Sequence, residues 1–227
     1  MLLALIVPLS TLGAQSVLIV PASAALDREA YVFALEHQSD ALDRVADAVD
    51  PLGRARYLVP AMVGAYVTTR IIRNRRWSEA LVRIGVGYAA ADIVESLLKP
   101  AVGRHRPDSL RRPWRFRPFN AKGDWHSFPS AHTVHAFALA AGIAEEVDNP
   151  WISAGTYFLA SCVGLQRVYT GSHWLSDVTG SAVLALAVSK TTNRWLRKRH
   201  PERPEAGRPL QLVMHPTGFA VRLPVPR

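Results

Sequence analysis

The sequence predicts an all-α fold, a helical bundle of about six helices with the candidate active site at one end, plus a short C-terminal β-hairpin. Three observations predict it. Apolar stretches recur along the chain with the length and spacing of helices and not of strands. No internal repeat or low-complexity linker divides the middle of the chain. Of the 227 residues, 49% are hydrophobic, which is enough for one full core.

The first element is an apolar N-terminal segment, residues 1–25. It resembles an export signal, with small residues at Leu12-Gly13-Ala14 and a second candidate cleavage site at Ala22-Ser23-Ala24. No Lys or Arg precedes Arg28, so an uncleaved anchor is the alternative. Asp27 is then expected to cap a helix, with Ser39-Asp40 as a candidate interruption and Pro51-Leu52-Gly53 as its end.

Five further apolar stretches predict helices. They are Tyr57–Thr69, Leu81–Leu98, Thr133–Val147, Trp151–Val168 and Leu175–Ser189. Between the second and the third, the arginine-rich segment from Gly103 to Gly123 contains three prolines and predicts a long loop. Loops of that length inside a compact domain commonly carry function.

The C-terminal segment differs from the rest of the chain. A basic, proline-rich stretch leads to two short β-prone runs on either side of Pro216-Thr217-Gly218, which predicts a hairpin without assigned chemistry. We therefore expect a signal peptide or anchor at 1–25, a helical domain at 26–199, and a basic linker with the hairpin at 200–227.

The net charge of +9 is unevenly placed. The clusters are Arg70, Arg73, Arg75 and Arg76; Arg104, Arg106, Arg111, Arg112, Arg115 and Arg117; and Arg194, Arg197, Lys198, Arg199 and Arg203. Such clusters attract phosphorylated substrates, anionic lipid headgroups or nucleic acid, and a solvated basic surface is the alternative for the first and third. No nucleic-acid-binding motif accompanies them, so nucleic acid is excluded as a partner.

Location is predicted from the export signal and from hydropathy. The mean hydropathy of +0.06 is low for a protein with many membrane spans. One long apolar stretch also contains Arg83, Asp92 and Glu95. We expect a soluble or peripherally attached protein of the bacterial cell envelope, exported to the periplasm, with an integral membrane protein as the alternative. The single Cys162 cannot form an intramolecular disulfide and adds nothing on compartment.

Three short motifs carry the chemistry. They are Lys99-x6-Arg106-Pro107, Pro129-Ser130-Ala131-His132 and Arg167-x5-His173-x3-Asp177. Together they supply three cations, a hydroxyl, two imidazoles and a carboxylate. This set suits a phosphomonoester, because cations hold the non-bridging oxygens, one imidazole attacks phosphorus and the other protonates the departing alcohol.

Each motif taken alone has a plainer explanation. Basic residues commonly end helices, Ser130 suits a helix N-cap, and His173 and Asp177 are spaced like a structural pair on one helix face. The combination and order of all three favour catalysis. A helix beginning near Ser130 offers free N–H groups to an anion. A carboxylate that accepts from one nitrogen of His173 leaves the other free to attack.

These motifs resemble the signature of the type-2 phosphatidic acid phosphatase superfamily, which includes bacterial acid phosphatases and vanadium-dependent haloperoxidases. The signature reads Lys-x6-Arg-Pro, Pro-Ser-Gly-His and Ser-Arg-x5-His-x3-Asp, and the resemblance covers roughly Leu81 to Ser189. It implies a helical bundle in which the motifs converge. The implied phosphate ligands are Lys99, Arg106, Ser130, the backbone N–H of Ala131, and Arg167. The implied catalytic residues are His173 as the nucleophile, His132 as the general acid and Asp177 as the residue that orients His173.

Two positions depart from the signature: Ala131 stands for Gly, and Gln166 for Ser. Alanine retains its N–H, but a left-handed backbone there would cost roughly 1 kcal/mol. Gln166 still offers hydrogen bonds. Neither change removes a group that acts on phosphate.

The resemblance implies a metal-independent phosphatase that forms a covalent phosphohistidine and needs no cofactor, although vanadate or phosphate could occupy the site. The alternatives are a haloperoxidase, disfavoured by the short chain, and a non-catalytic lipid- or polyanion-binding homologue. The expected substrate is a phosphorylated small molecule or lipid. If Trp114, Phe116 and Phe119 of the basic loop line the site entrance, a lipid phosphate or diphosphate is favoured; an ordinary structural loop is the alternative. Oligomeric state is not predicted.

Overall fold

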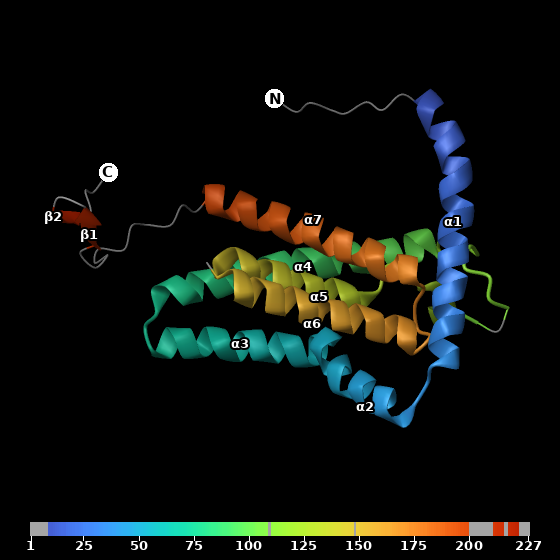
Figure 1. Ribbon diagram of the computed structural model, residues 1–227, viewed down its shortest axis with the longest axis horizontal. Coiled ribbons are helices and arrows are strands. Elements are labelled where there is room, and N and C mark those ends of the chain that lie inside the picture. Colours follow the sequence, from blue (N-terminus) through green and yellow to red (C-terminus); the bar gives the residue numbers. More distant parts are fainter. Residues whose placement is uncertain (1–8, 109, 148, 200–210, 216–217, 223–227) are drawn as a thin grey trace. The chain divides into compact units, whose positions relative to one another are not determined.

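The computed structural model describes residues 9–108, 110–147, 149–199, 211–215 and 218–222, with side chains described between residues 22 and 199. The elements of the main body are α1 (Leu9–Glu36), α2 (Asp40–Val49), η1 (Asp50–Gly53), α3 (Ala55–Ile71), α4 (Arg75–Val102), η2 (Gly123–Trp125), α5 (Ala131–Glu146), α6 (Pro150–Tyr169) and α7 (Leu175–Arg199) (Figure 1). The predicted all-α fold is confirmed. Within the described residues the bundle has one helix more than predicted, because α2 stands apart from α1.

The chain forms two compact units, Met1–Asn193 and Arg194–Arg227. In the second, β1 (Gln211–His215) pairs antiparallel with β2 (Gly218–Arg222), so that Val213 lies opposite Ala220. This pairing has the register of a hairpin. The predicted linker at 200–210 lies outside the described residues.

The N-terminal part differs from the prediction in one respect. Helix α1 runs through Asp27 without a break, so a helix start at Asp27 is wrong. The Asp27 carboxylate instead accepts hydrogen bonds from the backbone N–H of Ser176, at 2.7 Å, and from the Arg104 guanidinium, at 2.7 Å. The break comes at Ser39, whose hydroxyl caps α2 by accepting from Leu42 N–H. Residues 1–8 of the predicted export segment lie outside the described residues.

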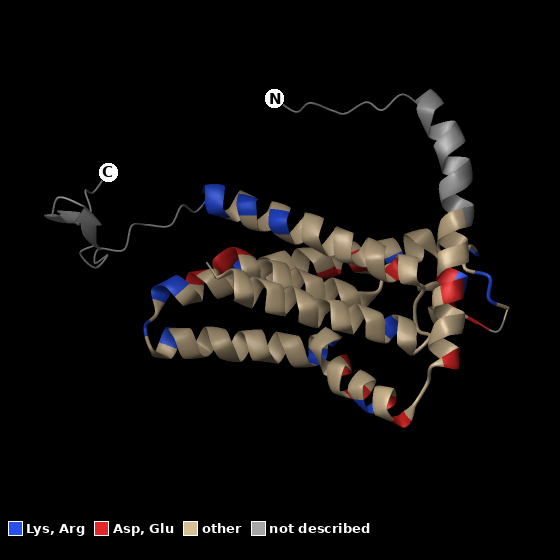
Figure 2. Cartoon of the chain, in the orientation of Figure 1, with Lys and Arg blue, Asp and Glu red and all other residues tan. Residues whose placement is uncertain are grey.

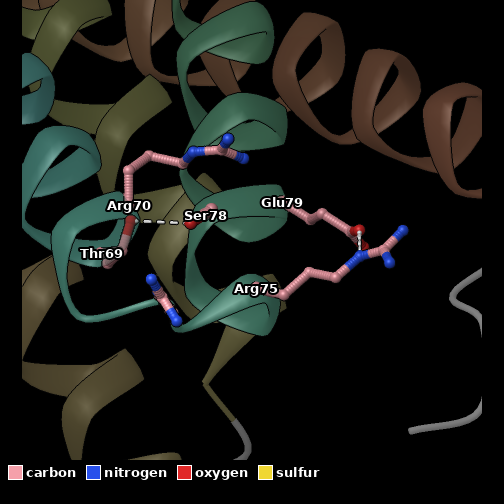
Figure 3. A pocket seen from close by; sticks show the side chains of 6 residues that line it. Thr69, Arg70, Arg75, Ser78 and Glu79 are labelled. Atoms are coloured by element: carbon pink, nitrogen blue, oxygen red, sulfur yellow. Dashed lines mark hydrogen bonds and ion pairs between the residues drawn. The ribbon is translucent and has the colours of Figure 1, made fainter.

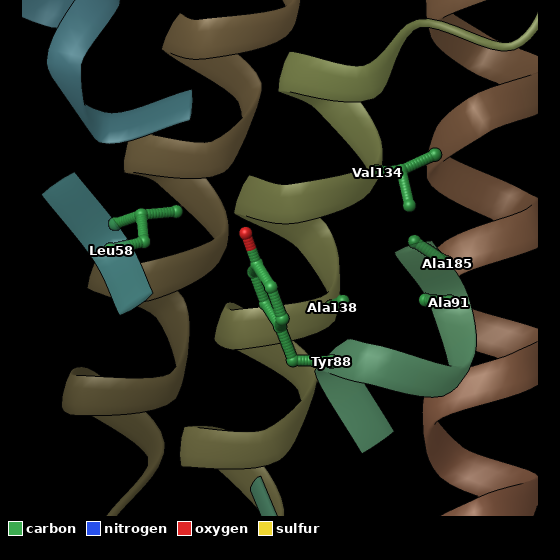
Figure 4. Close-up of a cluster of buried hydrophobic side chains, with 6 residues drawn as sticks. All are labelled: Leu58, Tyr88, Ala91, Val134, Ala138 and Ala185. Carbon is green, nitrogen blue, oxygen red and sulfur yellow. The ribbon is translucent and has the colours of Figure 1, made fainter. Parts of the chain in front are cut away.

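The core lies where α3, α4, α5 and α7 meet (Figure 4). Leu58, Tyr88, Ala91, Val134, Ala138 and Ala185 form one buried cluster. A second buried cluster, on the other side of α5, joins Ala136 and Ala140 to Ala160 and Val163 of α6. Small residues on both sides of α5 allow neighbouring helices to approach closely. Helix α5 is therefore the central element, and its N-terminal turn is held firmly in place.

The outward faces of several helices are apolar. On α3 the exposed side chains include Val59, Val63, Val67 and Ile71, which recur every four residues and so form a stripe on one helix face. Charged residues of α3, α5 and α6 stand near the helix ends, leaving the middles uncharged (Figure 2). Exposed apolar surface of this extent marks an interaction face. Over the described residues, no helix combines the length and apolar composition needed to cross a membrane.

Helix α4 ends at Gly103, where the chain turns sharply. Gly103 has a φ of +58°, the left-handed region that glycine enters without cost. Its carbonyl accepts from Arg117 N–H at 2.7 Å, so the end of the long loop returns against the end of α4. A Cβ atom on residue 103 would lie 1.9 Å from the carbonyl oxygen of Arg117. This close approach fixes the path of the chain into Arg104 and Arg106.

Replacing Gly103 by Ala should therefore lower the free energy of unfolding by at least about 2 kcal/mol, because backbone strain adds to a clash with backbone atoms. The matched control is Gly85→Ala in α4, where a new Cβ meets nothing within 4 Å. That change should stabilise the helix by about 0.5–1 kcal/mol. Thermal unfolding followed by circular dichroism measures both. Equal melting temperatures for the two variants would contradict the role of Gly103.

Candidate active site

The three motifs meet at one end of the bundle. Lys99 comes from the last turn of α4, Arg106 from the loop after it, and Arg167 from the last turn of α6. His173 stands just before α7, with its Nε2 atom 3.5 Å from Nη1 of Arg106. The positive charges of Arg106, Lys99 and Arg167 all act on the His173 ring. The cations and the imidazole are thus gathered around one place.

His173 is held as a neutral ring with one unprotonated nitrogen. Its Nδ1 lies 2.6 Å from the backbone carbonyl of Ser127. A carbonyl oxygen can only accept, so Nδ1 carries the proton and Nε2 keeps its lone pair. Burial lowers the pKa of His173 well below its ordinary value, and the neighbouring positive charges of Arg106 and Lys99 lower it further. The ring is therefore neutral, and its unprotonated Nε2 atom faces a guanidinium.

Asp177 makes no direct hydrogen bond to His173, contrary to expectation. Its Oδ2 lies 3.9 Å from Nδ1 of His173, beyond hydrogen-bond distance. The expected direct hydrogen bond is absent because α7 begins at Leu175, so His173 precedes the helix instead of lying one turn below Asp177. Asp177 reaches back to accept from the N–H of Trp174 at 2.9 Å, as in a capping box. It also accepts from the Ser127 hydroxyl at 2.5 Å. Its effect on His173 therefore passes through Ser127.

Arg104 is a residue whose role the sequence did not reveal. Its guanidinium is buried and donates to Asp177 at 2.6 Å and to Asp27 at 2.7 Å. It thereby joins the long loop to α1 and to the start of α7. Burial raises the pKa of Asp177, and the Arg104 charge and the Ser127 hydroxyl act against that rise. In the sequence, Arg104 is one of six arginines in the second basic cluster, and nothing in the pattern distinguishes it from its exposed neighbours.

The N-terminus of α5 offers donors to an anion. Ser130 occupies the N-cap position as predicted, but its hydroxyl makes no capping hydrogen bond. That hydroxyl accepts from Thr133 at 3.0 Å, which leaves its own proton available. Ala131 is the first helical residue and does not have a positive φ. The left-handed strain considered for alanine therefore does not arise, and its backbone N–H remains in the first turn of the helix.

Neighbouring oxygen atoms hold the guanidiniums of Arg106 and Arg167 in position. Arg167 donates from Nε to the Gln166 side chain at 2.5 Å. The Gln that departs from the family signature thus orients the guanidinium. Arg106 donates from Nη1 to the Ser172 carbonyl at 2.9 Å. Burial lowers the pKa of both arginines, and nearby carboxylates oppose the shift, so both remain charged. Lys99 pairs with the buried Glu95 one turn earlier.

His132 lies in the first turn of α5, beside a carboxylate that sequence reasoning missed. Its Nε2 is 3.5 Å from Oδ1 of Asp50, and has no hydrogen-bond partner among the described residues. Asp50 accepts from Arg167 at 2.5 Å and from Arg54. Burial lowers the pKa of His132 to about 4, helped by the charges of Arg167 and Arg54 and opposed by Asp50. In the sequence, Pro51-Leu52-Gly53 predicts the end of a helix, and Asp50 in front of it gives no sign of a site residue.

Asp50 itself is held ionised. Burial alone would raise its pKa, but the hydrogen bond from Arg54 and the charge of Arg167 outweigh burial and bring the pKa below its usual value. The site therefore brings Lys99, Arg106 and Arg167 together with the neutral ring of His173, and the Asp50 carboxylate lies between His132 and Arg167. Among the described residues, no group of His, Cys, Asp or Glu side chains is arranged to hold a metal ion.

Comparison with known proteins agrees with this geometry. The family model described as "PAP2 superfamily" matches residues 80–201, more than half of the chain. Lipid A 1-phosphatase of Porphyromonas gingivalis is 31% identical over 120 residues, which are 52% of this chain and 24% of that protein. Lipid A 4'-phosphatase of Bacteroides thetaiotaomicron is 28% identical over 121 residues, 50% of this chain and 54% of that protein.

A solved structure has the same fold. The first transmembrane PAP2 type phosphatidylglycerolphosphate phosphatase from Bacillus subtilis superimposes with a TM-score of 0.61 at 20% identity, covering 86% of this chain and 92% of that chain. The chain spans a quarter to about half the length of the two lipid A phosphatases.

The contacts of Asp50 generate a prediction about His132. Because the Asp50 charge favours the protonated ring, Asp50→Asn should lower the pKa of His132 below its value of about 4. Histidine-selective nuclear magnetic resonance titration measures this pKa, with the His132 signal assigned by its loss in His132→Gln. The matched control is Asp92→Asn, which removes a carboxylate 2.6 Å from His135 instead. A His132 pKa that rises in Asp50→Asn, or that falls equally in both variants, would contradict this electrostatic account.

Proposed function

The chain belongs to the PAP2 superfamily, and on that basis we propose that it is a metal-independent phosphatase that cleaves phosphomonoesters of lipids through a phosphohistidine on His173. One observation carries the proposal: a neutral His173 ring whose Nε2 lone pair lies 3.5 Å from a guanidinium. A neutral imidazole whose Nε2 carries no proton, placed beside three cations, is suited to attack an anion that those cations have bound.

Binding of the phosphate group is the first step. Lys99, Arg106 and Arg167 neutralise its non-bridging oxygens, and the Ser130 hydroxyl and the Ala131 N–H donate to the same oxygens. The α5 N-terminus adds its favourable dipole. Because Ser172 and Gln166 already hold the two guanidiniums, little reorganisation is needed when phosphate arrives.

In the transfer step, the Nε2 lone pair of His173 forms a bond to phosphorus while the bond from phosphorus to the substrate's alcohol oxygen breaks. His132, protonated in the complex, gives its proton to that oxygen, and a neutral alcohol leaves. The low pKa of His132 belongs to the site without phosphate. A bound phosphate dianion opposes the charges of Arg167 and Arg54 and so raises this pKa.

Hydrolysis then restores the enzyme. The neutral His132 takes a proton from water, whose oxygen bonds to phosphorus as the bond from phosphorus to Nε2 breaks. Inorganic phosphate and free His173 result. Throughout, the Ser127 carbonyl holds the proton of Nδ1, and it stabilises the positive charge that develops on the ring. Asp177 and Arg104 act as positioning residues because they hold Ser127 and the start of α7.

A lipid substrate is supported by two further observations. The relatives named above act on lipid A and phosphatidylglycerophosphate, which are phosphorylated lipids. The chain also exposes an apolar stripe on α3, and exposes Trp114, Phe116 and Phe119 in the loop segment that follows Arg106. We place the enzyme at a membrane of the bacterial envelope, with these apolar residues against lipid. The exposed Arg111 and Arg112 of the same loop attract the anionic headgroup.

The two histidines have separable effects with p-nitrophenyl phosphate, whose leaving group needs no proton. His173→Ala should lose at least about 1000-fold in turnover and release no initial burst of nitrophenol. His132→Ala should release one burst and then stall, because water is no longer activated. Rapid-quench kinetics measures both. The control is His37→Ala, at an exposed position just after α1. Unchanged turnover in His173→Ala, as for a lipid-binding homologue without catalysis, would overturn the proposal.

The loop generates a second test. Arg111→Gln with Arg112→Gln should raise KM about tenfold for a long-chain phosphatidate presented in mixed micelles, since charged contacts to the headgroup are lost. KM for p-nitrophenyl phosphate should stay unchanged. Arg28→Gln with Arg44→Gln removes the same charge from exposed positions on α1 and α2 and serves as the control. If KM for the phosphatidate in the Arg111→Gln, Arg112→Gln variant equals that of the unchanged protein, the loop does not select lipids.

A further inference from the structure

A second basic site lies at the turn between α3 and α4. A cavity of about 400 Å³ opens there, lined by Thr69, Arg70, Arg73, Arg75, Ser78 and Glu79 (Figure 3). Arg75 begins α4 and Lys99 stands in its last turn. At about 1.5 Å per residue, the two ends lie about 36 Å apart along the helix. The cavity is therefore separate from the catalytic cluster.

The cavity has an excess of positive charge. It is lined by three guanidiniums and one carboxylate. Arg75 donates to Glu79 at 2.7 Å, and this pair is neutral (Figure 3). Within the part of the chain that the structure describes, the side chains of Arg70 and Arg73 have no hydrogen-bond or ion-pair partner. Two guanidiniums with all their donors unused are thus directed to the same cavity.

The turn that carries these arginines is firmly held. The Ser78 hydroxyl of α4 lies 3.0 Å from the Thr69 hydroxyl of α3 (Figure 3). The N–H of Asn74 donates to the Thr69 carbonyl at 2.8 Å, and the Asn74 side chain caps α4. Arg73 has a φ of 55°, a left-handed conformation that a residue with a side chain keeps only where its surroundings enforce it. The backbone positions of Arg70 and Arg73 are therefore set before any ligand binds.

The surroundings of the cavity indicate what the ligand carries besides negative charge. Ile71 and Ile72, between the two arginines in sequence, are 75% and 63% exposed. Ile71 also ends the apolar stripe of α3. Cations placed where an apolar face ends suit the boundary between lipid headgroups and acyl chains. A free phosphate ion would use the guanidiniums alone, whereas a phospholipid uses both the guanidiniums and the isoleucines.

We propose that this cavity binds the phosphate group of an anionic membrane phospholipid that is not the substrate. Guanidiniums bind phosphate oxygens in pairs, and Arg70 with Arg73 supply two such forks. The acyl chains of the lipid lie against Ile71 and Ile72. The site anchors the end of the bundle opposite the catalytic cluster, and it does not depend on the proposed reaction.

Equilibrium binding of a fluorescent phosphatidylglycerol tests the proposal, with the full-length protein in a non-ionic detergent. This lipid is a phosphodiester, so a phosphomonoesterase does not consume it. Arg70→Gln with Arg73→Gln should weaken binding about tenfold or more, the factor expected from one lost charged hydrogen bond. The control pair Arg28→Gln and Arg44→Gln should bind as the unchanged protein does. Hydrolysis of p-nitrophenyl phosphate should be the same in both.

Three outcomes would overturn the proposal. The first is equal lipid affinity in the unchanged protein and in both double variants. The second is an equal loss of affinity in both double variants, which would indicate general charge attraction, and the third is displacement of the lipid by an excess of inorganic phosphate, which would indicate a site for the free ion. Circular dichroism checks folding. The single variant Arg70→Gln, which leaves the left-handed turn untouched, should still bind more weakly than the unchanged protein, and its failure to do so would count equally against the site.

Discussion

The carboxylate of Asp177 has no exposed surface, and three segments depend on it for their position. The Arg104 guanidinium, the Ser127 hydroxyl and the N–H of Trp174 all donate to it. A buried carboxylate is stable only when donors surround it, so these groups must come together as the chain folds. Arg104 extends the network to Asp27 of α1. Removing Arg104 would therefore leave the buried carboxylates of Asp177 and Asp27 without the cation that they share.

The position of His173 depends on this network. Ser127 uses its hydroxyl on Asp177 and its carbonyl on Nδ1 of His173, so the same residue transmits the position of the carboxylate to the ring. Burial and three nearby cations keep the ring neutral. Lys99 is paired with Glu95 and Arg167 with Asp50, so a bound phosphate group would share these two cations with protein carboxylates and would meet Arg106 as well. Asp50 also lies beside His132.

The sequence predicted the fold class because helix-length apolar stretches and turn residues agree with one another, as at Gly103 and Ser39. It also predicted which residues meet, because three spaced motifs resemble one family signature. It did not predict Arg104 or Asp50. Both act through contacts between segments far apart in the chain, and a lone arginine or an Asp-Pro pair carries no local sign of such contacts. The direct hydrogen bond expected between Asp177 and His173 is absent because it depends on the residue at which α7 begins. Helix boundaries are the least certain part of sequence reasoning.

The central claim is that Nε2 of His173 and the three cations bind one tetrahedral anion together. A crystal structure with orthovanadate, which takes the five-coordinate geometry of phosphoryl transfer, tests this directly. The account predicts vanadium bonded to Nε2 of His173, its equatorial oxygens contacting Lys99, Arg106 and Arg167, and an apical oxygen facing His132. Vanadate bound away from His173, or held by the cations with the ring turned aside, would contradict it.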